Sequence, residues 1–357
     1  MSSAATASSE PDAAQAPRFL KMVPWAVAVS VLTLVALLVW YQARRDVDVL
    51  AALRDVDPRV LPLALGLHMT MHAVWALRIR ILAGGLDVGI GYPRAWQLAT
   101  AGQFGGAVTP GRFGAEALRL TLLVRGGARG TAASRLVLAD RSTDMLFFAT
   151  AGTVAAALLP TLFGEEAVAL RVLSLVAVAG LLSMFFLLAW GLVRPSVVSR
   201  LVGAVAAGGL RLSRRPPRDL APAVQAFLER VRDGLAQLLR ERPWRLLAAA
   251  CCTAVIWGTE FSILWVLLDA FGYKVPLLPV LAAGVLITML AAVPLSPGGS
   301  GVAEVSALAL LSGLAPGLTP AFVLVWRGLT YYYDLVVGGL VTAVALPNKA
   351  ADGTIDG

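Results

Sequence analysis

The sequence contains very little lysine, histidine or cysteine. Two of its 357 residues are histidines and two are cysteines. The three lysines, Lys21, Lys274 and Lys349, each follow a residue other than glycine, which excludes a Walker-type phosphate-binding loop and an ATP motor built on it. The cysteines, Cys251 and Cys252, are adjacent within an apolar segment, so the sequence offers neither a disulfide framework nor a metal-binding cysteine spacing.

Charged residues are scarce too, at 15% of the chain, whereas hydrophobic residues make up 58% and the mean hydropathy is +0.76. Ordinary soluble domains carry about 25% charged residues. Several apolar windows reach about 18 residues or more, enough to cross roughly 30 Å of hydrocarbon as a helix, and none alternates as the strands of a membrane barrel do. The sequence therefore predicts an all-α polytopic membrane protein.

Hydropathy predicts about six full transmembrane helices. We place them near residues 24–41, 59–83, 131–160, 167–193, 245–271 and 320–347. Two further apolar segments, at about 95–124 and 277–313, are broken by proline and glycine, and each is predicted to form a re-entrant helical hairpin. The predicted regions are a disordered cytoplasmic tail at 1–23, a membrane half at 24–193, a basic connection at 194–244, a second membrane half at 245–347 and a tail at 348–357.

Arginine predicts the orientation in the membrane. Residues 194–245 contain eleven arginines and four acidic residues, whereas the loop after the third predicted span contains Glu165 and Glu166. The positive-inside rule places the basic connection, and with it both termini, in the cytoplasm of a plasma-membrane protein. Apolar residues at helical spacing between Leu220 and Leu238 predict an amphipathic helix, either on the inner leaflet or packed against the spans as a linker.

The predicted outer loop contains two Asp-x-Asp pairs, at residues 46–48 and 55–57. Such pairs can bind a metal in a transferase that uses a lipid-linked donor. Arginine precedes each pair, and no histidine or second carboxylate cluster is close in sequence, so we favour a salt-paired interfacial helix. The transferase remains an alternative function.

The two broken segments resemble each other. Residues 110–116 read PGRFGAE and residues 297–304 read PGGSGVAE. An arginine follows each glutamate, 25 residues later at Arg141 and 23 residues later at Arg327, and an aspartate follows each arginine. We interpret the two halves as an inverted repeat. The residues that break the hairpins are Pro110, Gly111, Gly114, Pro297, Gly298, Gly299 and Gly301.

Interrupted helices of two inverted halves form the substrate site of many secondary transporters, near the middle of the bilayer. Where a helix restarts after a glycine turn, its free N–H groups and the positive end of its dipole form a natural anion site. The sequence thus predicts that the two tips meet and bind an anionic group.

Charged residues inside apolar segments support that prediction, because each would cost about 2.5–3.5 kcal/mol at the centre of a lipid-facing helix. They must pair with one another or face water, so substrate binding and internal salt bridging both remain open. We expect the arginines to bind phosphate and the glutamates to balance charge, hold the hairpins or accept a proton, with Tyr331 as a lining residue or interfacial anchor. The charged residues are Arg112, Glu116, Arg119, Asp140, Arg141, Asp144, Glu304, Arg327 and Asp334.

Other polar residues lie in the predicted spans. His68 and His72 are four residues apart and could serve metal binding or proton exchange, but no third ligand is close in sequence, and we predict no metal. Glu260 is isolated, and either a proton-coupling role or a hydrogen bond to a neighbour is open. Arg78 and Arg80 lie near the inner end of the second span, and we expect both to extend toward the interface.

These motifs resemble the transmembrane, flippase-like region of the lysylphosphatidylglycerol synthase family. The resemblance covers about residues 59–345 and is carried by Pro-Gly-x-x-Gly-[small]-acid-x-x-Arg at 110–119, by Asp140 with Arg141, and by Ser-Pro-Gly-Gly-x-Gly-x-x-Glu at 296–304. It implies translocation of a lipid between leaflets. Only PNKAADGTIDG follows the last predicted span, so we expect a stand-alone member without the synthase domain.

The resemblance and the residues together predict a lipid flippase of secondary type that is not an enzyme and uses no cofactor. Its expected partners are membrane lipids with an anionic or phosphate-bearing headgroup, a lipid-synthesis enzyme and further copies of the chain, and nucleic acid is not expected. A non-transporting scaffold of a lipid-synthesis complex is a second alternative.

Overall fold

A computed structural model describes residues 15–44, 49–54, 56–163 and 221–345, together with isolated positions between 172 and 200. Every regular element in these ranges is helical, as the hydropathy predicts. The predicted span at 167–193 lies largely outside the described residues, and so do Asp46, Asp48 and Asp55 of the two Asp-x-Asp pairs.

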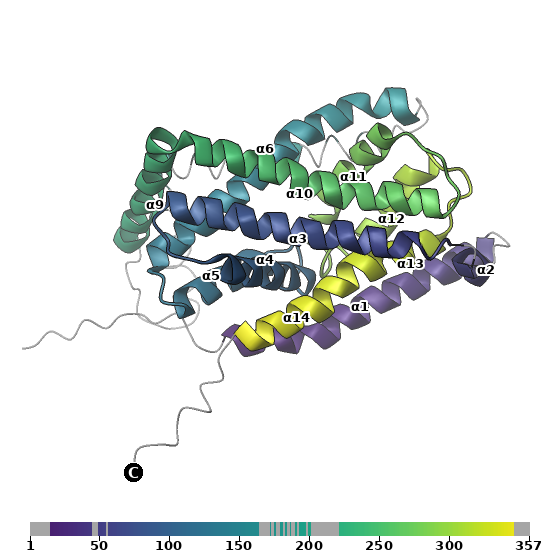
Figure 1. Ribbon diagram of the computed structural model, residues 1–357, viewed down its shortest axis with the longest axis horizontal. Coiled ribbons are helices and arrows are strands. Elements are labelled where there is room, and N and C mark those ends of the chain that lie inside the picture. The colour runs from purple at the N-terminus through teal and green to yellow at the C-terminus, as the bar shows by residue number, and fades with distance from the viewer. Residues whose placement is uncertain are drawn as a thin grey trace, which may run out of the picture.

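Long helices form the body of the protein (Figure 1). Among the described residues, four helical segments are long and apolar enough to cross a membrane: α1 (Gln15–Arg44), α3 (Val60–Gly85), α10 (Pro243–Ala270) and the segment Pro320–Ala345. Helix α6 (Gly130–Phe163) is longer still, with 34 residues, and carries several charges in its first half. Helix α2 (Val49–Arg54) is a short connection between α1 and α3.

The two broken segments are pairs of short helices. The first pair is α4 (Tyr92–Ala107) and α5 (Gly114–Arg125), and the second is α11 (Leu277–Ala291) and α12 (Val302–Ser312). Each of these helices has 16 residues or fewer, which is shorter than the roughly 20 needed to span a bilayer. In Figure 1, the α4–α5 pair lies toward the end of the molecule that carries α9, and the α11–α12 pair toward the end that carries α2. The hairpins therefore extend into the bundle from opposite ends.

Helix α9 (Ala221–Glu241) covers one end of the bundle (Figure 1). Val231 and Leu238 are buried, and α9 packs against α6 and α10. Just beyond it, Arg242 donates to the carbonyl oxygen of Gly84 at 2.6 Å and Arg245 to that of Ile81 at 2.9 Å. The first bond satisfies a carbonyl that the end of α3 leaves unpaired, and the second adds a further contact to the last turns of that helix. The predicted amphipathic helix therefore packs on the long helices.

Two predicted boundaries change. Helix α1 begins at Gln15, so residues 15–23 of the predicted tail are helical. The last predicted span, 320–347, contains α13 (Pro320–Arg327), a π-helical turn (Gly328–Tyr332) and α14 (Tyr333–Ala345). The wide turn lies where the Tyr331 ring meets the loop of the second hairpin, a contact that hydropathy cannot reveal. π-helical turns inside α-helices occur frequently at functional sites.

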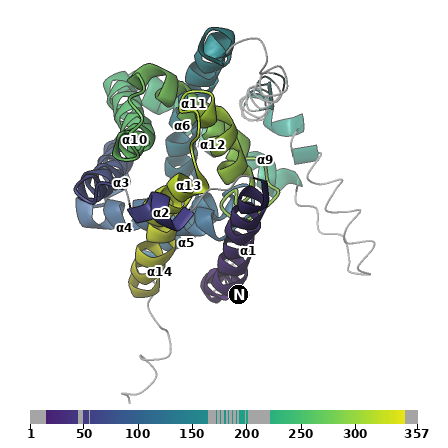
Figure 2. The same ribbon diagram turned by 90° about the vertical axis from the view of Figure 1, so that its right-hand side faces the viewer.

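The first hairpin is enclosed by both halves of the chain. Helix α4 packs against α3 and α14, and the end-on view shows α14 next to α4 (Figure 2). A close approach at Gly338 permits this packing, since a Cβ there would lie 2.8 Å from the Cβ of Phe104. Small residues commonly allow such contacts between membrane helices.

Candidate functional site

The tips of the two hairpins touch. Pro110 and Pro297 form an isolated antiparallel bridge, and the N–H of Gly298 donates to the carbonyl oxygen of Thr109 at 3.3 Å. Residues almost 190 positions apart in sequence thus meet at the turns where their helices break. The backbone contact joins the two halves of the predicted repeat.

Left-handed backbone angles form both turns. In the second tip, Gly298 and Gly299 have φ of 54° and 70°, and a Cβ on Gly298 would collide with the Tyr331 ring. In the first tip, Gly111 has φ of 62°, and the next residue, Arg112, has φ of 60° although it is not glycine. Non-glycine residues rarely adopt this region outside turns and functional sites, so the fold holds Arg112 in a costly conformation.

Side chains and turns occupy the N–H groups that begin the second helix of each hairpin. The N–H of Gly114 donates to Thr109 Oγ1 at 2.8 Å, and the N–H of Gly301 donates to Glu304 Oε2 at 2.6 Å. The N–H groups of Ala115 and Ala303 donate to carbonyl oxygens within their own tips. The tips thus use these four donors to hold their own shape, and these four are not free to bind an anion.

Equivalent ion pairs link each hairpin to the helix that follows it. Arg327 Nε donates to Glu304 Oε1 at 2.8 Å, and Arg141 Nε lies 3.5 Å from Glu116 Oε1. The matching sequence spacings of the two halves thus correspond to matching contacts. The pairs differ in burial, since the Glu304 side chain is fully buried whereas the Glu116 and Arg141 side chains are 30% and 33% exposed.

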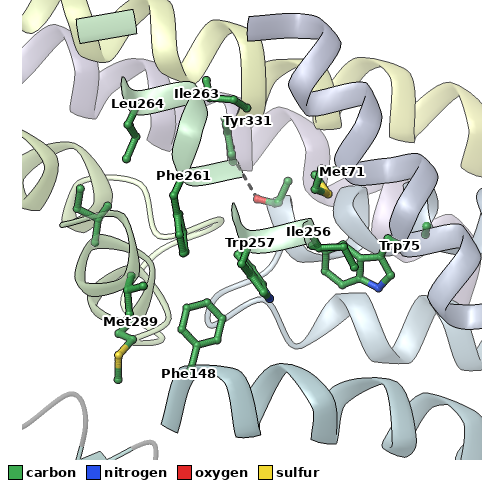
Figure 3. Packing of buried hydrophobic residues seen from close by; sticks show 14 of the residues in the cluster. Met71, Trp75, Phe148, Ile256, Trp257, Phe261, Ile263, Leu264, Met289 and Tyr331 are labelled. Carbon is green, nitrogen blue, oxygen red and sulfur yellow. Dashed lines mark hydrogen bonds between the residues drawn. The ribbon is translucent and has the colours of Figure 1, made fainter. Parts of the chain in front are cut away.

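Arg327 also holds the second tip. Its Nη2 donates to Ser300 Oγ at 3.3 Å and to the carbonyl oxygen of Gly298 at 3.4 Å, and its guanidinium lies 4.3 Å from the centre of the Tyr331 ring. The Tyr331 hydroxyl donates to the carbonyl oxygen of Ala107 at 3.3 Å, the bond drawn in Figure 3. This chain of contacts connects α13 to both hairpins.

Arg78 is fully buried, so the expectation that it extends to the interface is wrong. Its Nε donates to Asp140 at 2.8 Å, and its Nη1 donates to Asp144 at 2.6 Å and to Thr253 at 2.8 Å. The two aspartates on α6 face inward and hold the guanidinium, which outweighs its attraction to the interface. Arg80 is exposed, as expected.

Arg119 belongs to the same network. Its Nη1 donates to Asp140 at 3.0 Å and its Nε to the carbonyl oxygen of Leu98 at 3.2 Å, with the guanidinium 4.7 Å from the Trp75 ring centre. Asp144 also accepts from Trp257 Nε1 at 3.0 Å. For Arg119, Asp140 and Asp144, these contacts correspond to internal salt bridging, one of the two roles that the sequence left open.

A second buried cluster lies along the same face of α3. Asp334 Oδ1 lies 3.3 Å from His68 Nε2 and 3.0 Å from His72 Nε2. His68 Nδ1 lies 3.1 Å from Glu260 Oε2, and His72 Nδ1 lies 3.3 Å from the Thr100 hydroxyl. Both histidines are 1% exposed. The third partner that the sequence did not show is Asp334, 262 residues away from His72.

Sequence reasoning missed that one face of α3 contacts both clusters. His68, His72, Trp75 and Arg78 follow one another at intervals of four, three and three residues, which places them on one side of the helix. A polar side within an otherwise apolar span indicates an inward-facing surface. That periodicity was the available signal.

A cavity of about 440 Å³ lies beside the contact between the tips. Arg112, Arg141 and Arg327 line it, and Asp144, Glu260 and Asp334 supply the acidic part of its wall. Much of the remaining wall is apolar, and Figure 3 shows part of it. The apolar side chains of that part are Met71, Trp75, Phe148, Ile256, Trp257 and Met289. Arg119 is not among the residues that line this cavity.

Arg112 differs from the other arginines of the lining. Its Nη2 donates to Gln103 Oε1 at 2.6 Å, a neutral acceptor. Within the described part of the chain, no carboxylate oxygen lies within 4.0 Å of its guanidinium nitrogens. Arg327 is neutralised by Glu304 and Arg141 is loosely paired with Glu116. The cavity thus contains one cation without an ionic partner among the described residues, at the tip of the first hairpin.

Comparison with known proteins gives consistent results. Residues 23–338 match the model of the lysylphosphatidylglycerol synthase transmembrane region. A UPF0104 membrane protein of Archaeoglobus fulgidus is 26% identical over 282 residues, which cover 79% of this chain and 85% of the relative. A UPF0104 membrane protein of Pyrococcus horikoshii is 22% identical over 325 residues, covering 87% and 93%. The chain therefore belongs to the lysylphosphatidylglycerol synthase transmembrane-region family.

Proposed function

We propose that this integral membrane protein moves a lipid with an anionic, phosphate-bearing headgroup between the two leaflets, without chemical catalysis. The observation that carries the proposal is the Arg112 guanidinium, which lines the cavity beside the tip contact with a neutral partner only. Arg112 is partly buried, and a cation withdrawn from water without an ionic partner is costly, a cost that an anionic headgroup offsets.

The chemistry of the lining fits such a headgroup. A guanidinium can donate two parallel hydrogen bonds to phosphate, so Arg112 is suited to hold it, with the partly exposed Arg141 as a second donor. A volume of about 440 Å³ is within the range of small-molecule sites and accommodates a headgroup, while the acyl chains remain in the bilayer. Glu304 and Arg327 hold the second tip in this proposal.

The inverted arrangement supports alternating access. Two hairpins that enter from opposite ends and touch at their tips can open the cavity to one leaflet at a time. In this proposal the α9 end faces the cytoplasm of the plasma membrane, as the arginines between residues 194 and 245 favour.

Reconstitution in liposomes tests the proposal. Fluorescent phosphatidylglycerol in the outer leaflet should move inward and become protected from an impermeant quencher. Arg112→Ala should slow this movement about 10–100-fold, since a hydrogen bond to a charged group contributes about 1.5–3 kcal/mol. Arg80→Ala removes one exposed positive charge and should leave the rate unchanged.

Gel filtration and thermal unfolding establish that each variant is folded. Arg112→Gln provides a polar replacement if Arg112→Ala does not fold. An unchanged rate in a folded Arg112 variant contradicts the proposal. Wild-type protein that moves no anionic lipid but co-purifies with a lipid-synthesis enzyme favours the scaffold.

A further inference from the structure

We infer that His68, His72 and Asp334 bind one divalent transition-metal ion of the zinc type, with Glu260 and Thr100 as the supporting partners of the histidines. One ligand atom from each of the three residues lies within 4.8 Å of the other two. The inference rests on this cluster alone and does not depend on lipid transport.

The distances suit such an ion. Zinc binds histidine nitrogen and carboxylate oxygen at about 2.0–2.2 Å, so ligands at tetrahedral angles lie about 3.4 Å apart. Asp334 Oδ1 lies 3.3 Å and 3.0 Å from the two Nε2 atoms. The separation between the two histidines is the one that must adjust on binding, and both residues belong to the same helix.

The outer partners leave both Nε2 atoms available. Glu260 as a carboxylate can only accept, so His68 Nδ1, 3.1 Å away, carries the proton and a neutral His68 has its lone pair on Nε2. Thr100 can accept from His72 Nδ1 in the same way at 3.3 Å. A histidine that binds a metal almost always has its other nitrogen held by a carboxylate or another acceptor. If both histidines are neutral and no cation is bound, the Nε2 lone pairs of His68 and His72 both face Asp334 Oδ1.

The charges of Asp334 and Glu260 also favour a bound cation. Among the described residues, neither Asp334 nor Glu260 has an arginine or lysine nitrogen within 4.0 Å, and their ion-pair partners are the histidines. With both histidines neutral, the cluster would carry two negative charges, one on the buried Asp334 and one on the partly buried Glu260. A divalent cation neutralises these charges, and its ligands would come from α3 and α14, with Glu260 of α10 behind them.

The site also has a route for the ion. Asp334 and Glu260 line the 440 Å³ cavity, so an ion could enter from there and keep a water molecule in its fourth position. The π-helical turn Gly328–Tyr332 ends two residues before Asp334. Histidine and carboxylate ligands suit zinc, and cobalt is its spectroscopic substitute.

Metal analysis of the purified protein tests the inference. Because the chain contains only two histidines, the protein should carry a tag without histidine. After dialysis against zinc and then against metal-free buffer, elemental analysis should find about one zinc ion per chain. Cobalt should give the intense visible absorption of a four- or five-coordinate site. His72→Ala should weaken binding at least 10-fold, and Glu260→Gln about 10–100-fold.

Two further variants make the result decisive. The double variant Cys251→Ser, Cys252→Ser should bind zinc and cobalt as the wild type does, which excludes a thiolate ligand. Asp334→Asn preserves the side-chain shape and should weaken binding in the same way if His72→Ala does not fold. A folded wild type that binds neither zinc nor cobalt, or a folded His72→Ala that binds as tightly as the wild type, overturns the inference. If the folded wild type binds neither metal, the cluster binds protons in place of a metal ion.

Discussion

Replacing Arg78 with methionine should destabilise the protein more than replacement of any exposed arginine. Methionine preserves the length of the side chain and removes the hydrogen bonds to Asp140, Asp144 and Thr253. Asp140 retains Arg119 and Trp75 as partners, whereas Asp144 retains Trp257. The variant therefore leaves one buried carboxylate with a single neutral donor among the described contacts.

The size of the stability loss in Arg78→Met depends on how deeply the Arg78 side chain is buried. Removing one partner of a buried ion pair costs about 3–5 kcal/mol, because the remaining charge is uncompensated. An arginine that extended to the interface would cost about 1 kcal/mol or less. We therefore expect Arg78→Met to lower the free energy of unfolding by about 3–5 kcal/mol, and Arg80→Met to change it by less than 1 kcal/mol.

Equilibrium unfolding in mixed micelles measures this difference, and Trp75 and Trp257 lie within the network as fluorescent reporters. The double variant Arg78→Met, Asp144→Leu removes both charges of the pair and should be more stable than Arg78→Met alone. A loss of less than about 1 kcal/mol in the free energy of unfolding of Arg78→Met would contradict a buried ion pair at Arg78, and so would a further loss in the double variant.

Two other predictions concern the hairpins. Glu304→Ala should lower the free energy of unfolding by about 3–5 kcal/mol, whereas Glu116→Ala should lower it by about 1 kcal/mol or less, and similar losses would show that burial does not separate these equivalent pairs. In a background with both native cysteines changed to serine, Pro110→Cys with Pro297→Cys should form a disulfide under mild oxidation, because Cα atoms paired across an antiparallel bridge are about 4.5–5.5 Å apart. The disulfide should stop lipid movement until it is reduced, and failure of the cysteines to react would place the tips apart.

Local composition is enough to predict much of the fold. Hydropathy predicts α3, α6 and α10 to within a few residues, because a bilayer requires about 20 apolar residues in a helix. Clusters of proline and glycine mark both hairpins, since several such residues close together disfavour a continuous helix. The π-helical turn could not be predicted, because it depends on how Tyr331 meets a loop 33 residues earlier in the chain.

The sequence predicted which residues belong to the candidate site better than it predicted which of them contact one another. The spacing from glutamate to arginine in each half predicted the equivalence of Glu116 with Glu304, but not that one pair is buried and the other half-exposed. Arg78 was misplaced because its distance from the span end was the only local guide, while its partners lie 62 to 66 residues away. Which side chains pair between helices depends on which face of each helix points into the bundle, and a single sequence indicates that only indirectly.

The two prolines at the contact between the tips limit how many backbone hydrogen bonds the tips can form with each other. Proline has no N–H group, so neither Pro110 nor Pro297 can donate across the bridge, and hydrogen bonds cannot spread from it into a longer ladder. The backbone bond from Gly298 to Thr109 contributes only about 0.5–1.5 kcal/mol. Breaking that bond alone makes the joined state less favourable by a factor of roughly 2 to 12, so this backbone bond does not by itself lock the two tips together.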